Sequence, residues 1–517
     1  MAPHRRPLST PAIVLVFSVF IAASCGLAYE LVIAALASYL LGDSLLQFST
    51  VIGCYLFAMG IGSHLSRYIR DDRLLRSFVE VELLVGLIGG CSAALLFALF
   101  AAQSWAFRSL LYGLVFIVGL LVGMEIPLVT RLLNQQSDGE RPALGDLVSR
   151  VLTFDYLGAL AVSLLFPLIL APWLGLVRTA FLFGLLNAVV AAYTLFVLRR
   201  QLAQAGGLWL RIAGVLAVLG VGMAMAPRLT EWAENRAYGG TVVHGAQSPY
   251  QRVVLTRWQD DLRLYLNGDL QFSSRDEYRY HEALVHPAMS LRPGTRSVLI
   301  LGGGDGLAAR EVLKYPEVQS VTLVDLDAEV TDLFATLPEL VSLNQGALAD
   351  RRLRVINDDA IHWLEQSSNT FDVAIVDFPD PTTFATGKLY SVPFYRLLSR
   401  HLAADGVVAV QASSPFYVPH AFWCIDTTLR EAGWHTLPYH AYVPSFGEWG
   451  YVLASHDAAM RPPTQFAVRT RFLDTATAAA MFVFPPDMAP RPVQPNRLDD
   501  LALVRYFEKD WLRVAPD

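Results

Sequence analysis

Charged residues are scarce in this chain of 517 residues, of which 17% are Asp, Glu, Lys or Arg and 54% are hydrophobic. So little charge excludes an ordinary soluble protein and indicates a membrane portion. The net charge is −6, and no basic patch interleaved with aromatic residues occurs, so no nucleic-acid partner is expected. Only four cysteines are present and none forms a CxxC pair, which argues against a disulfide framework or a zinc site.

Long apolar runs fill the first half of the chain and stop near residue 226. Each is close to the ~20 residues that a helix needs to cross a bilayer. The first run has too long an apolar core for a signal peptide. We predict a transmembrane domain of about seven helices over residues 1–230. The predicted spans are 12–41, 46–66, 79–102, 107–130, 151–171, 177–198 and 208–226.

Acidic residues occur within or beside these spans, namely Glu30, Glu80, Glu82, Glu125 and Asp155. A charge in a membrane span is costly, so each is a candidate functional residue. The alternative is that several lie at the membrane interface or pair with nearby arginines. The sequence names no transported ligand.

The second half has globular composition and regular alternation of strands and helices. Residues 241–265 alternate in a β-like manner between turn residues, which predicts a small β-sheet unit over 240–290 that includes the start of a helix at 276–290. Alternation from residue 291 to 457 predicts a Rossmann-like α/β domain with a parallel, doubly wound sheet. The predicted strands are 297–301, 320–325, 353–356, 371–377 and 406–411, and the helices between them are 306–314, 327–336, 359–366 and 391–402.

A glycine-rich turn follows the first strand of this domain, in SVLILGGGDGLAAREVL. Gly302 and Gly304 let the backbone approach a ligand, and the helix after them offers free N–H groups. The next strand ends in Asp325, about 20 residues on, where an acid accepts hydrogen bonds from a ribose diol. The alternative is a helix-capping acid. Asp359, after the third strand, could hold an adenine amino group or serve as an N-cap.

Further acids follow the fourth strand, in FDVAIVDFPDP. The carboxyl ends of strands form the ligand crevice in such sheets, so Asp377 and Asp380 would face Asp305 there. This pocket would attract a polyamine cation and repel a carboxylate; the alternative is a solvated Asp-Pro turn. His281 and His286 are spaced poorly for a shared helical face, so no metal site is expected. The loops at 413–416 and 443–451 suit a lid over an apolar methylene chain.

Together these stretches resemble the polyamine aminopropyltransferases, the spermidine synthase family. The matching segments are YLNGDLQFSSRDEYRYHEALVHP, VLILGGGDGLAAREVLKY, VTLVDLD, RVINDDA, FDVAIVDFPDP, KLYSVPFY and VVAVQASS, which cover most of residues 245–455. The resemblance implies that decarboxylated S-adenosylmethionine, as co-substrate and without a metal, donates an aminopropyl group to putrescine or a similar diamine, giving spermidine and methylthioadenosine. The apolar runs and the tail over 458–517, with an amphipathic helix at 498–513, are similar to the membrane-bound branch.

The resemblance also implies roles for individual residues. Asp377 matches the proton acceptor and Tyr280 a tyrosine that assists at the attacking nitrogen. Asp380 matches the acid that holds the acceptor amine, while His281 and Asp305 match polyamine and aminopropyl contacts. The donor has lost its carboxylate, so Asp305 can bind its ammonium, whereas the carboxylate of ordinary S-adenosylmethionine would be repelled.

The remaining carried-over positions concern the thioadenosine part and the edge of the pocket. The cofactor-binding set is Gln251, Gly302, Gly304, Asp325, Asp359 and Ala360. Gln411 and Gln271 are weaker pocket candidates. The chain departs from the family at Phe378-Pro379, between the two acids, and at Val443, near a tyrosine of the acceptor pocket; Glu448 could supply a replacement charge there.

Two other functions remain open from the sequence. One is an S-adenosylmethionine-dependent methyltransferase, which shares the Rossmann-like core, and the other is a polyamine-binding membrane transporter or sensor with an inactive synthase-like domain. Asp305 and the pair of acids after the fourth strand argue against the first, and Asp377 with Tyr280 argues against the second. The family also implies a homodimer.

Arginine distribution predicts a multi-pass protein of the cell membrane with a cytoplasmic N-terminus. Seven crossings would then put the C-terminal half outside, yet donor and putrescine are made in the cytoplasm. We expect a cytoplasmic catalytic domain, which requires that one apolar run does not cross. The arginines concerned are Arg5, Arg6, Arg67, Arg70, Arg73, Arg76, Arg131, Arg141, Arg150, Arg199 and Arg200.

Overall fold

The computed structural model describes residues 10–41, 44–102, 106–135, 144–199, 206–238, 240–463 and 465–514. The chain forms two compact units, Met1–Val242 and Val243–Asp517. They are called the helical unit and, after the activity that the resemblance implies, the catalytic unit. Arg5, Arg6, Arg141 and Arg200, which carry part of the charge argument, lie outside the described residues.

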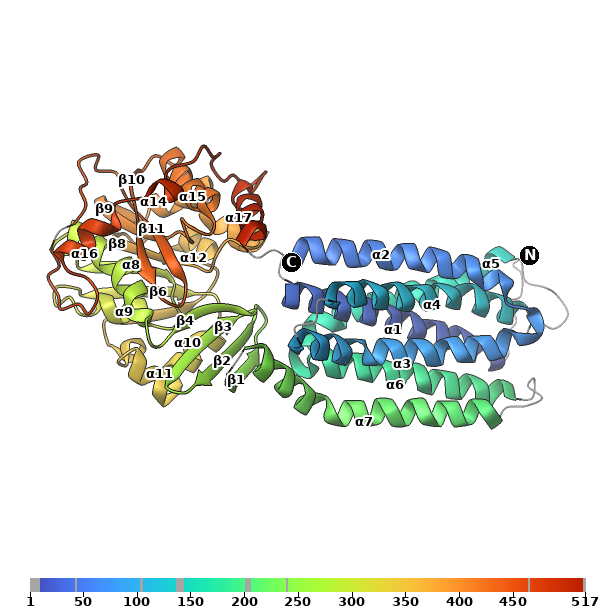
Figure 1. Cartoon of the computed structure of the whole chain (residues 1–517). Coiled ribbons are helices and arrows are strands. Elements are labelled where there is room, and N and C mark those ends of the chain that lie inside the picture. Colours follow the sequence, from blue (N-terminus) through green and yellow to red (C-terminus); the bar gives the residue numbers. More distant parts are fainter. Residues whose placement is uncertain are drawn as a thin grey trace. The chain divides into compact units, whose positions relative to one another are not determined.

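Seven long helices make up the helical unit (Figure 1). All seven, among the described residues, are long and apolar enough to cross a membrane by length and composition. The predicted first span is a single continuous helix, and the last helix runs about ten residues further than predicted. The helices are α1 (Thr10–Leu41), α2 (Ser44–Leu65), α3 (Leu74–Ala101), α4 (Phe107–Gln135), α5 (Leu144–Leu165), which continues as a π-helical segment at Phe166–Leu174, α6 (Leu176–Leu198) and α7 (Gly206–Ala237).

Close contact between these helices depends on glycine. A Cβ atom on Gly123 of α4 would lie 2.2 Å from the carbonyl oxygen of Met59 on α2. A Cβ atom on Gly86 of α3 would lie 2.9 Å from the carbonyl oxygen of Gly184 on α6. Small residues at such points let the backbones pack together, as in membrane helix bundles.

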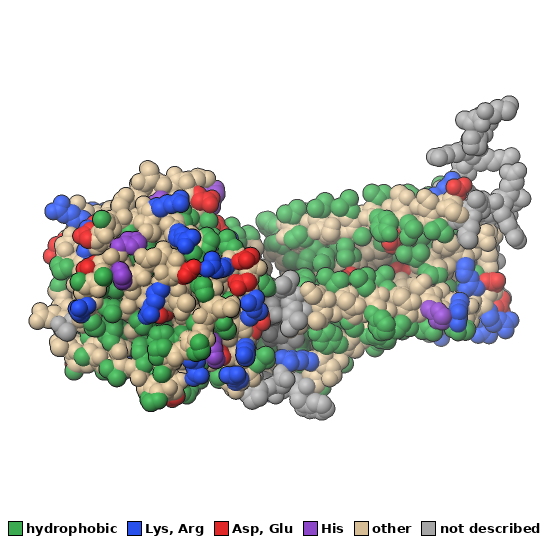
Figure 2. Space-filling view, turned by 90° about the horizontal axis from the view of Figure 1, so that it is seen from above, with side chains coloured by type: hydrophobic (Ala, Val, Ile, Leu, Met, Phe, Trp, Pro, Cys, Tyr) green, Lys and Arg blue, Asp and Glu red, His purple; other side chains and the backbone are tan. Residues whose placement is uncertain are grey.

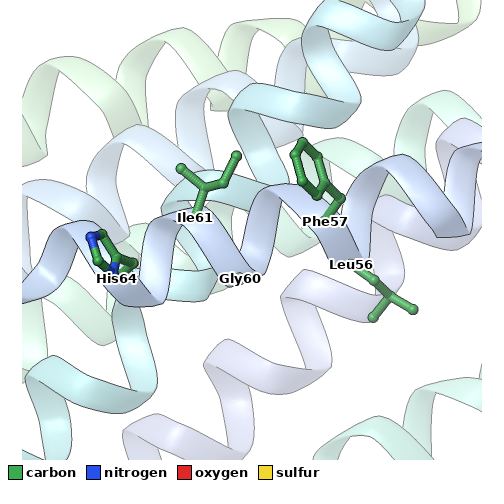
Figure 3. Close-up of a pocket in the computed structure, with 5 residues that line it drawn as sticks. All are labelled: Leu56, Phe57, Gly60, Ile61 and His64. Atoms are coloured by element: carbon green, nitrogen blue, oxygen red, sulfur yellow. The ribbon is translucent and has the colours of Figure 1, made fainter.

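On the face of the helical unit that Figure 2 shows, hydrophobic side chains predominate between the ends, and basic side chains gather at one end. An open apolar hollow of about 340 Å³ lies on α2, lined by Leu56, Phe57, Gly60, Ile61 and His64. These side chains project from a single helix (Figure 3). None of the predicted site residues lines this hollow.

The catalytic unit begins with a four-stranded sheet in the order β1-β2-β3-β4. The predicted β unit is therefore present, and it extends to residue 273. Its strands are β1 (Thr241–Gln247), β2 (Arg252–Trp258), β3 (Asp261–Leu266) and β4 (Asp269–Ser273).

A seven-stranded sheet in the order β10-β11-β9-β8-β5-β6-β7 forms the core of the unit. Strands β9, β8, β5, β6 and β7 are parallel. The strands are β5 (Ser297–Gly302), β6 (Ser320–Asp325), β7 (Leu353–Asn357), β8 (Phe371–Asp377), β9 (Leu402–Gln411), β10 (His435–Val443) and β11 (Gly447–Ser455). The principal helices are α8 (Glu277–Leu291), α9 (Leu307–Val312), α10 (Ala328–Thr336), α11 (Pro338–Leu343), α12 (Ala360–Gln366), α14 (Val392–Ser399) and α15 (Pro419–Glu431).

The five predicted strands are parallel, as expected, but the sheet is mixed because two strands that were not predicted join it at one edge. Strands β10 and β11 form an antiparallel hairpin, and β11 pairs antiparallel with β9. Residues 443–451, predicted to be a loop, lie mostly in these two strands. Glycine and proline in this stretch suggested a loop, but the buried residues 450–455 are fixed by pairing with β9, a partner remote in the sequence.

The C-terminal segment packs on the catalytic unit. The carboxylate of Glu282 on α8 accepts hydrogen bonds from three backbone N–H groups at 471–473. The side chain of Asn496 donates to the carbonyl oxygens of Gly387 and Tyr390. The predicted amphipathic helix is α17 (Ala502–Val514), and it packs against α15.

Candidate active site

The carboxyl ends of β8, β5 and β6 lie side by side, which brings distant acids together. Asp377 ends β8, Asp325 ends β6, and Asp305 lies in the turn after β5. The glycines of this turn are required sterically. A Cβ atom on Gly302 would lie 2.2 Å from the carbonyl oxygen of Asp377, and one on Gly304 would lie 2.7 Å from Cγ of Asp325. Such strand ends, at the point where the order reverses, form the ligand crevice of α/β sheets.

Asp377 and Tyr280 form a direct pair. The Tyr280 hydroxyl donates to Oδ1 of Asp377 at 2.6 Å. Burial raises the pKa of Asp377, and the charge of His281 and the bond from Tyr280 oppose this rise. Burial and the neighbouring carboxylate of Asp377 raise the pKa of Tyr280. Tyr280 therefore stays protonated and donates to Asp377, and no hydrogen bond to the other oxygen of Asp377 is seen among the described residues.

His281 connects Asp305 to the interior of the unit. Its Nδ1 lies 3.0 Å from Oε2 of Glu277, and its Nε2 lies 3.9 Å from Oδ2 of Asp305. Burial disfavours the charged imidazole, but the hydrogen bond with Glu277 and the charges of Asp305, Glu277 and Asp377 outweigh it and raise the pKa of His281 to about 9. Burial raises the pKa of Asp305 to about 6, and His281 opposes that rise. Oδ1 of Asp305 accepts the N–H of Leu307, whereas Oδ2, on the side of His281, makes no backbone hydrogen bond among the described residues.

Glu277 is itself held by Arg310 on α9. Two nitrogens of the Arg310 guanidinium each lie 2.9 Å from an oxygen of Glu277. Its Nε donates to Glu311 at 2.9 Å. A bidentate pair of this kind fixes the plane of the carboxylate, and so fixes the side of His281 that faces Asp305.

Replacing Glu277 with glutamine will lower the pKa of His281, because the neutral amide no longer stabilises the imidazolium while burial still opposes it. We expect deprotonation of His281 to give an alkaline limb near pH 9 in the pH–rate profile of the wild type, and in Glu277→Gln this limb should move to lower pH by at least about one unit. The measurement is the initial rate of methylthioadenosine release against pH. Glu365→Gln, an exposed glutamate on α12, is the control and leaves the limb in place. An unmoved limb in Glu277→Gln would contradict the assigned role.

Asp325 lies beside the glycine turn, where the ribose contact was predicted. Its Oδ2 accepts the N–H of Gly304 and its Oδ1 accepts the N–H of Asp327, both at 2.9 Å. Burial raises the pKa of Asp325 to about 6 despite these bonds. The side chain of Gln251 donates to Oδ2 of Asp327 at 2.9 Å, which places Gln251 at the same end of the crevice.

Asp359 performs the capping role that the sequence left open. Its Oδ1 accepts the N–H groups of Ile361 and His362 at the start of α12, and Ala360 is the first residue of that helix. Its Oδ2 lies 3.0 Å from Nζ of Lys388. Burial alone would raise the pKa of Asp359, but the bonds from Lys388 and the helix start lower it. An adenine contact at this carboxylate would have to share its oxygens with Lys388.

Asp380 is held by a residue that follows β9. The Ser413 hydroxyl donates to Oδ1 of Asp380 at 2.6 Å. Burial raises the pKa of Asp380 to about 6, with a further contribution from the charge of Asp269. Gln411 donates to the hydroxyl of Tyr390 at 2.7 Å and accepts the N–H of Ser413, so it supports the loop around Asp380 rather than projecting freely.

Aromatic rings border Tyr280. The ring centroids of Phe446 and Trp449 each lie 6.3 Å from that of Tyr280, and that of Tyr451 lies 5.6 Å away. These rings come from the hairpin over 435–455 and its turn. The aromatic side chains expected of a lid are therefore present, but most of residues 443–451 form strands and not the loop that was predicted.

Two other acceptor-side candidates have different surroundings. Gln271 donates to the backbone oxygen of Asp269. Glu448, suggested as a replacement charge, lies 2.8 Å from Nδ1 of His440.

Glu282, His286 and Glu311 form the one group, among the described residues, whose ligand atoms lie close enough together to suggest a metal. Their oxygens already accept N–H donors: Glu282 from the backbone at 471–473, and Glu311 from Arg310 and Lys314. His286 lies 2.9 Å from Glu311 and 3.0 Å from the Tyr315 hydroxyl. The three side chains therefore have hydrogen-bond partners within the protein and are explained by a structural role. The absence of a metal cofactor stays a prediction.

Sequence reasoning missed several supporting residues: Asp269, Glu277, Arg310, Asp327, Lys388 and Ser413. The i, i+4 spacing of Glu277 and His281 was a usable signal. Asp327 and Ser413 lie in stretches that the sequence analysis had singled out, VTLVDLD and the loop at 413–416, but without a role of their own. Arg310 meets Glu277 across 33 residues of chain, and no local pattern marks that contact.

Comparison with known proteins agrees with this geometry. Residues 277–464 match the family described as Spermine/spermidine synthase domain. The chain is 60% identical to polyamine aminopropyltransferase 1 of Ralstonia nicotianae over 512 residues, which is 98% of this chain and 97% of that protein. This chain belongs to the polyamine aminopropyltransferase family.

Two further aminopropyltransferases align along nearly their whole length. Polyamine aminopropyltransferase 2 of Ralstonia nicotianae is 61% identical over 503 residues, covering 96% of this chain and 98% of that protein. The polyamine aminopropyltransferase of Leptospira interrogans is 46% identical over 500 residues, covering 97% and 99%. The similarity includes the helical unit, so these aminopropyltransferases share both halves of the chain.

Proposed function

We propose that this aminopropyltransferase uses Asp377 as the proton acceptor in transferring an aminopropyl group from decarboxylated S-adenosylmethionine to putrescine or a similar diamine. The observation that carries the proposal is the bond between Tyr280 and Asp377 at the strand ends, beside Asp305. Purified full-length protein with this donor and putrescine should release methylthioadenosine and spermidine. Methyl transfer instead would support the methyltransferase alternative, and binding without turnover the inactive-domain alternative.

The donor is recognised by acids at both of its ends. Asp325 and Gln251 lie where the ribose of the thioadenosine part would bind, next to the turn at Gly302–Gly304. Oδ2 of Asp305 is free of backbone bonds and would hold the terminal ammonium of the aminopropyl chain. The sulfonium between them would lie close to Asp377, whose charge also interacts with Asp305 and Asp325.

The acceptor diamine would lie between Asp377 and Asp380. Asp380, fixed by Ser413, would hold the distant ammonium, and the rings of Phe446 and Trp449 would line the methylene chain. Asp269 adds a second negative charge on the Asp380 side. Two separated acids match a molecule with two ammonium groups.

The chemical step is a nucleophilic substitution at carbon. Asp377 takes a proton from the near ammonium, which frees the nitrogen lone pair, and Tyr280 keeps the carboxylate oriented. The nitrogen attacks the methylene carbon next to the sulfonium in line with the C–S bond. A C–N bond forms, the C–S bond breaks, and its electron pair goes to sulfur, which becomes the neutral thioether of methylthioadenosine.

Catalytic efficiency will fall as the pH decreases through about 6. Burial raises the pKa of Asp305, Asp325 and Asp380 to about 6 in the free enzyme. Each is therefore protonated near pH 6 instead of near pH 4, and a neutral acid cannot hold an ammonium. The limb in kcat/KM, which reports the free enzyme, should have a slope above one. Asp380→Asn should make it shallower, and a limb unchanged in position and slope would contradict the assignment.

The seven apolar helices support a location in the cell membrane. The cytoplasmic side is proposed for the catalytic unit because donor and diamine are made there, and with a cytoplasmic N-terminus this requires that one of the seven helices does not cross. A homodimer is the oligomeric state expected from the family. The test is a C-terminal fusion to a phosphatase that functions only outside the cytoplasm. Phosphatase activity of this fusion in cells would contradict the cytoplasmic orientation.

A further inference from the structure

Two acids in the interior of the helical unit have no partner for their carboxylate oxygens. Glu82 on α3 is 0% exposed and neither of its oxygens has a hydrogen-bond partner among the described residues. Glu125 on α4 is 5% exposed and its Oε1 also lacks one. Glu80, at the start of α3, shows the ordinary arrangement, because it lies 3.1 Å from Arg76 and 2.7 Å from Arg211.

Other helices bring unpartnered polar groups to the same region. The hydroxyl of Tyr29 on α1 is fully buried without a hydrogen-bond partner in the described chain, and it interacts electrostatically with both Glu82 and Glu125. Both amide atoms of Asn187 on α6 are likewise unpartnered, and its Cβ faces α3 at Gly86, one turn from Glu82. The cluster is therefore more than a set of acids: it is a mixed polar site formed by four helices.

Unpartnered carboxylates in an apolar interior are costly, and within membrane spans they mark sites that bind an ion or a substrate. The catalytic unit shows the contrast, because the buried acids Glu282 and Glu311 accept several N–H donors each. Both oxygens of Glu82 and Oε1 of Glu125 lack such donors among the described residues, so a ligand that brings positive charge and N–H groups would complete this site.

A third acid belongs to the same region. Glu125 interacts electrostatically with Glu82 and also with Asp155 on α5. Asp155 is half-buried, whereas Glu82 is fully buried, so the three acids differ in their access to the outside of the bundle. A linear polyamine has several ammonium groups joined by short methylene chains, so one molecule would match more than one of these acids.

We propose that the helical unit binds the ammonium groups of a linear polyamine at Asp155, Glu125 and Glu82, with Tyr29 and Asn187 completing the site. The choice of a polyamine rests on the proposed function of the catalytic unit, whereas the need for a cation rests on the helical unit alone. This second site is separate from the crevice of Asp377 and Asp380.

The test is equilibrium binding of radiolabelled spermidine to the full-length protein in detergent micelles. Wild type should show two classes of site per chain. Glu82→Gln/Glu125→Gln should remove one class, or weaken it at least about tenfold, because charge-assisted hydrogen bonds are lost, while kcat and KM for aminopropyl transfer stay unchanged. Glu80→Gln is the matched control, a neutralised glutamate of the same helix that is already paired, and it should retain both classes.

The proposal would be overturned by a single class of site in wild type, or by equal spermidine binding in wild type and the double variant. It would also be overturned if, at equal ionic strength, sodium chloride displaced labelled spermidine from the second class of site as well as unlabelled spermidine does. If the double variant does not elute from gel filtration as a folded species, the binding experiment is repeated with Tyr29→Phe, which removes only one oxygen atom. Weaker binding to the second class then supports the site, and unchanged binding rejects it. These results do not depend on methylthioadenosine release, so failure of the proposed reaction would be seen separately.

Discussion

Replacing Asp377 with asparagine will lower kcat for aminopropyl transfer by about 10³-fold, within the range that a positioned general base contributes. Asparagine has nearly the same shape and still accepts the hydrogen bond from Tyr280, but it cannot take a proton from the acceptor ammonium. The attacking nitrogen then keeps its proton and has no lone pair to offer. The measurement is the steady-state rate of methylthioadenosine release at saturating donor and putrescine.

The affinity of Asp377→Asn for the donor shows whether a lower rate results from loss of the proton acceptor or from a disturbed structure. Asp377→Asn should bind decarboxylated S-adenosylmethionine within a few-fold of wild type, because Asp305, Asp325 and the glycine turn are unchanged. Asp332→Asn, an exposed aspartate on α10, is the matched control and should keep full activity. Turnover within a few-fold of wild type in Asp377→Asn would show that another group accepts the proton.

Replacing Asp305 with asparagine will lower kcat/KM for the decarboxylated donor by about 10²-fold, the scale seen when one member of a buried charge pair is removed. The free Oδ2 of Asp305 is the oxygen we assign to the donor ammonium, and the amide that replaces it carries no charge. The same change should reduce the discrimination against ordinary S-adenosylmethionine, because the repulsion of its carboxylate disappears.

The decisive measurement is the inhibition constant of S-adenosylmethionine beside the kcat/KM of its decarboxylated form. In Asp305→Asn the two molecules should compete more equally than in wild type, and Asp332→Asn should leave their ratio unchanged. If both molecules lose affinity by the same factor, Asp305 would be a structural residue of the turn and would not select the donor.

The helix that carries Tyr280 and His281 connects these two predictions. Consecutive residues cannot face the same way on a helix, and here Tyr280 binds Asp377 while His281 faces Asp305. Tyr280 and His281 therefore connect α8 to Asp377 and to Asp305, and Glu277, held by Arg310, fixes His281. A shift of α8 would disturb the proton acceptor and the donor site together.

The elements of both units could be predicted from local pattern. Apolar runs gave the seven helices, because a membrane-length helix needs only its own residues to satisfy its backbone. Strand and helix alternation gave the parallel strands, and the capping alternative for Asp359 was already visible in its position before α12. The hairpin at 435–455 was missed because its position depends on pairing with β9.

The sequence by itself determined the kinds of group that this protein has: a glycine turn, acids at strand ends, a Tyr-His pair on one helix, and acids inside apolar runs. Only the tertiary structure decided which of them meet. The order β8-β5-β6 puts Asp377, Asp305 and Asp325 at one edge, Arg310 reaches Glu277 from the next helix, and four helices enclose Glu82 and Glu125. The reason is physical: hydrophobic period and backbone hydrogen bonding act over a few residues, whereas carboxylate charges interact across strands and helices that the chain order does not place together.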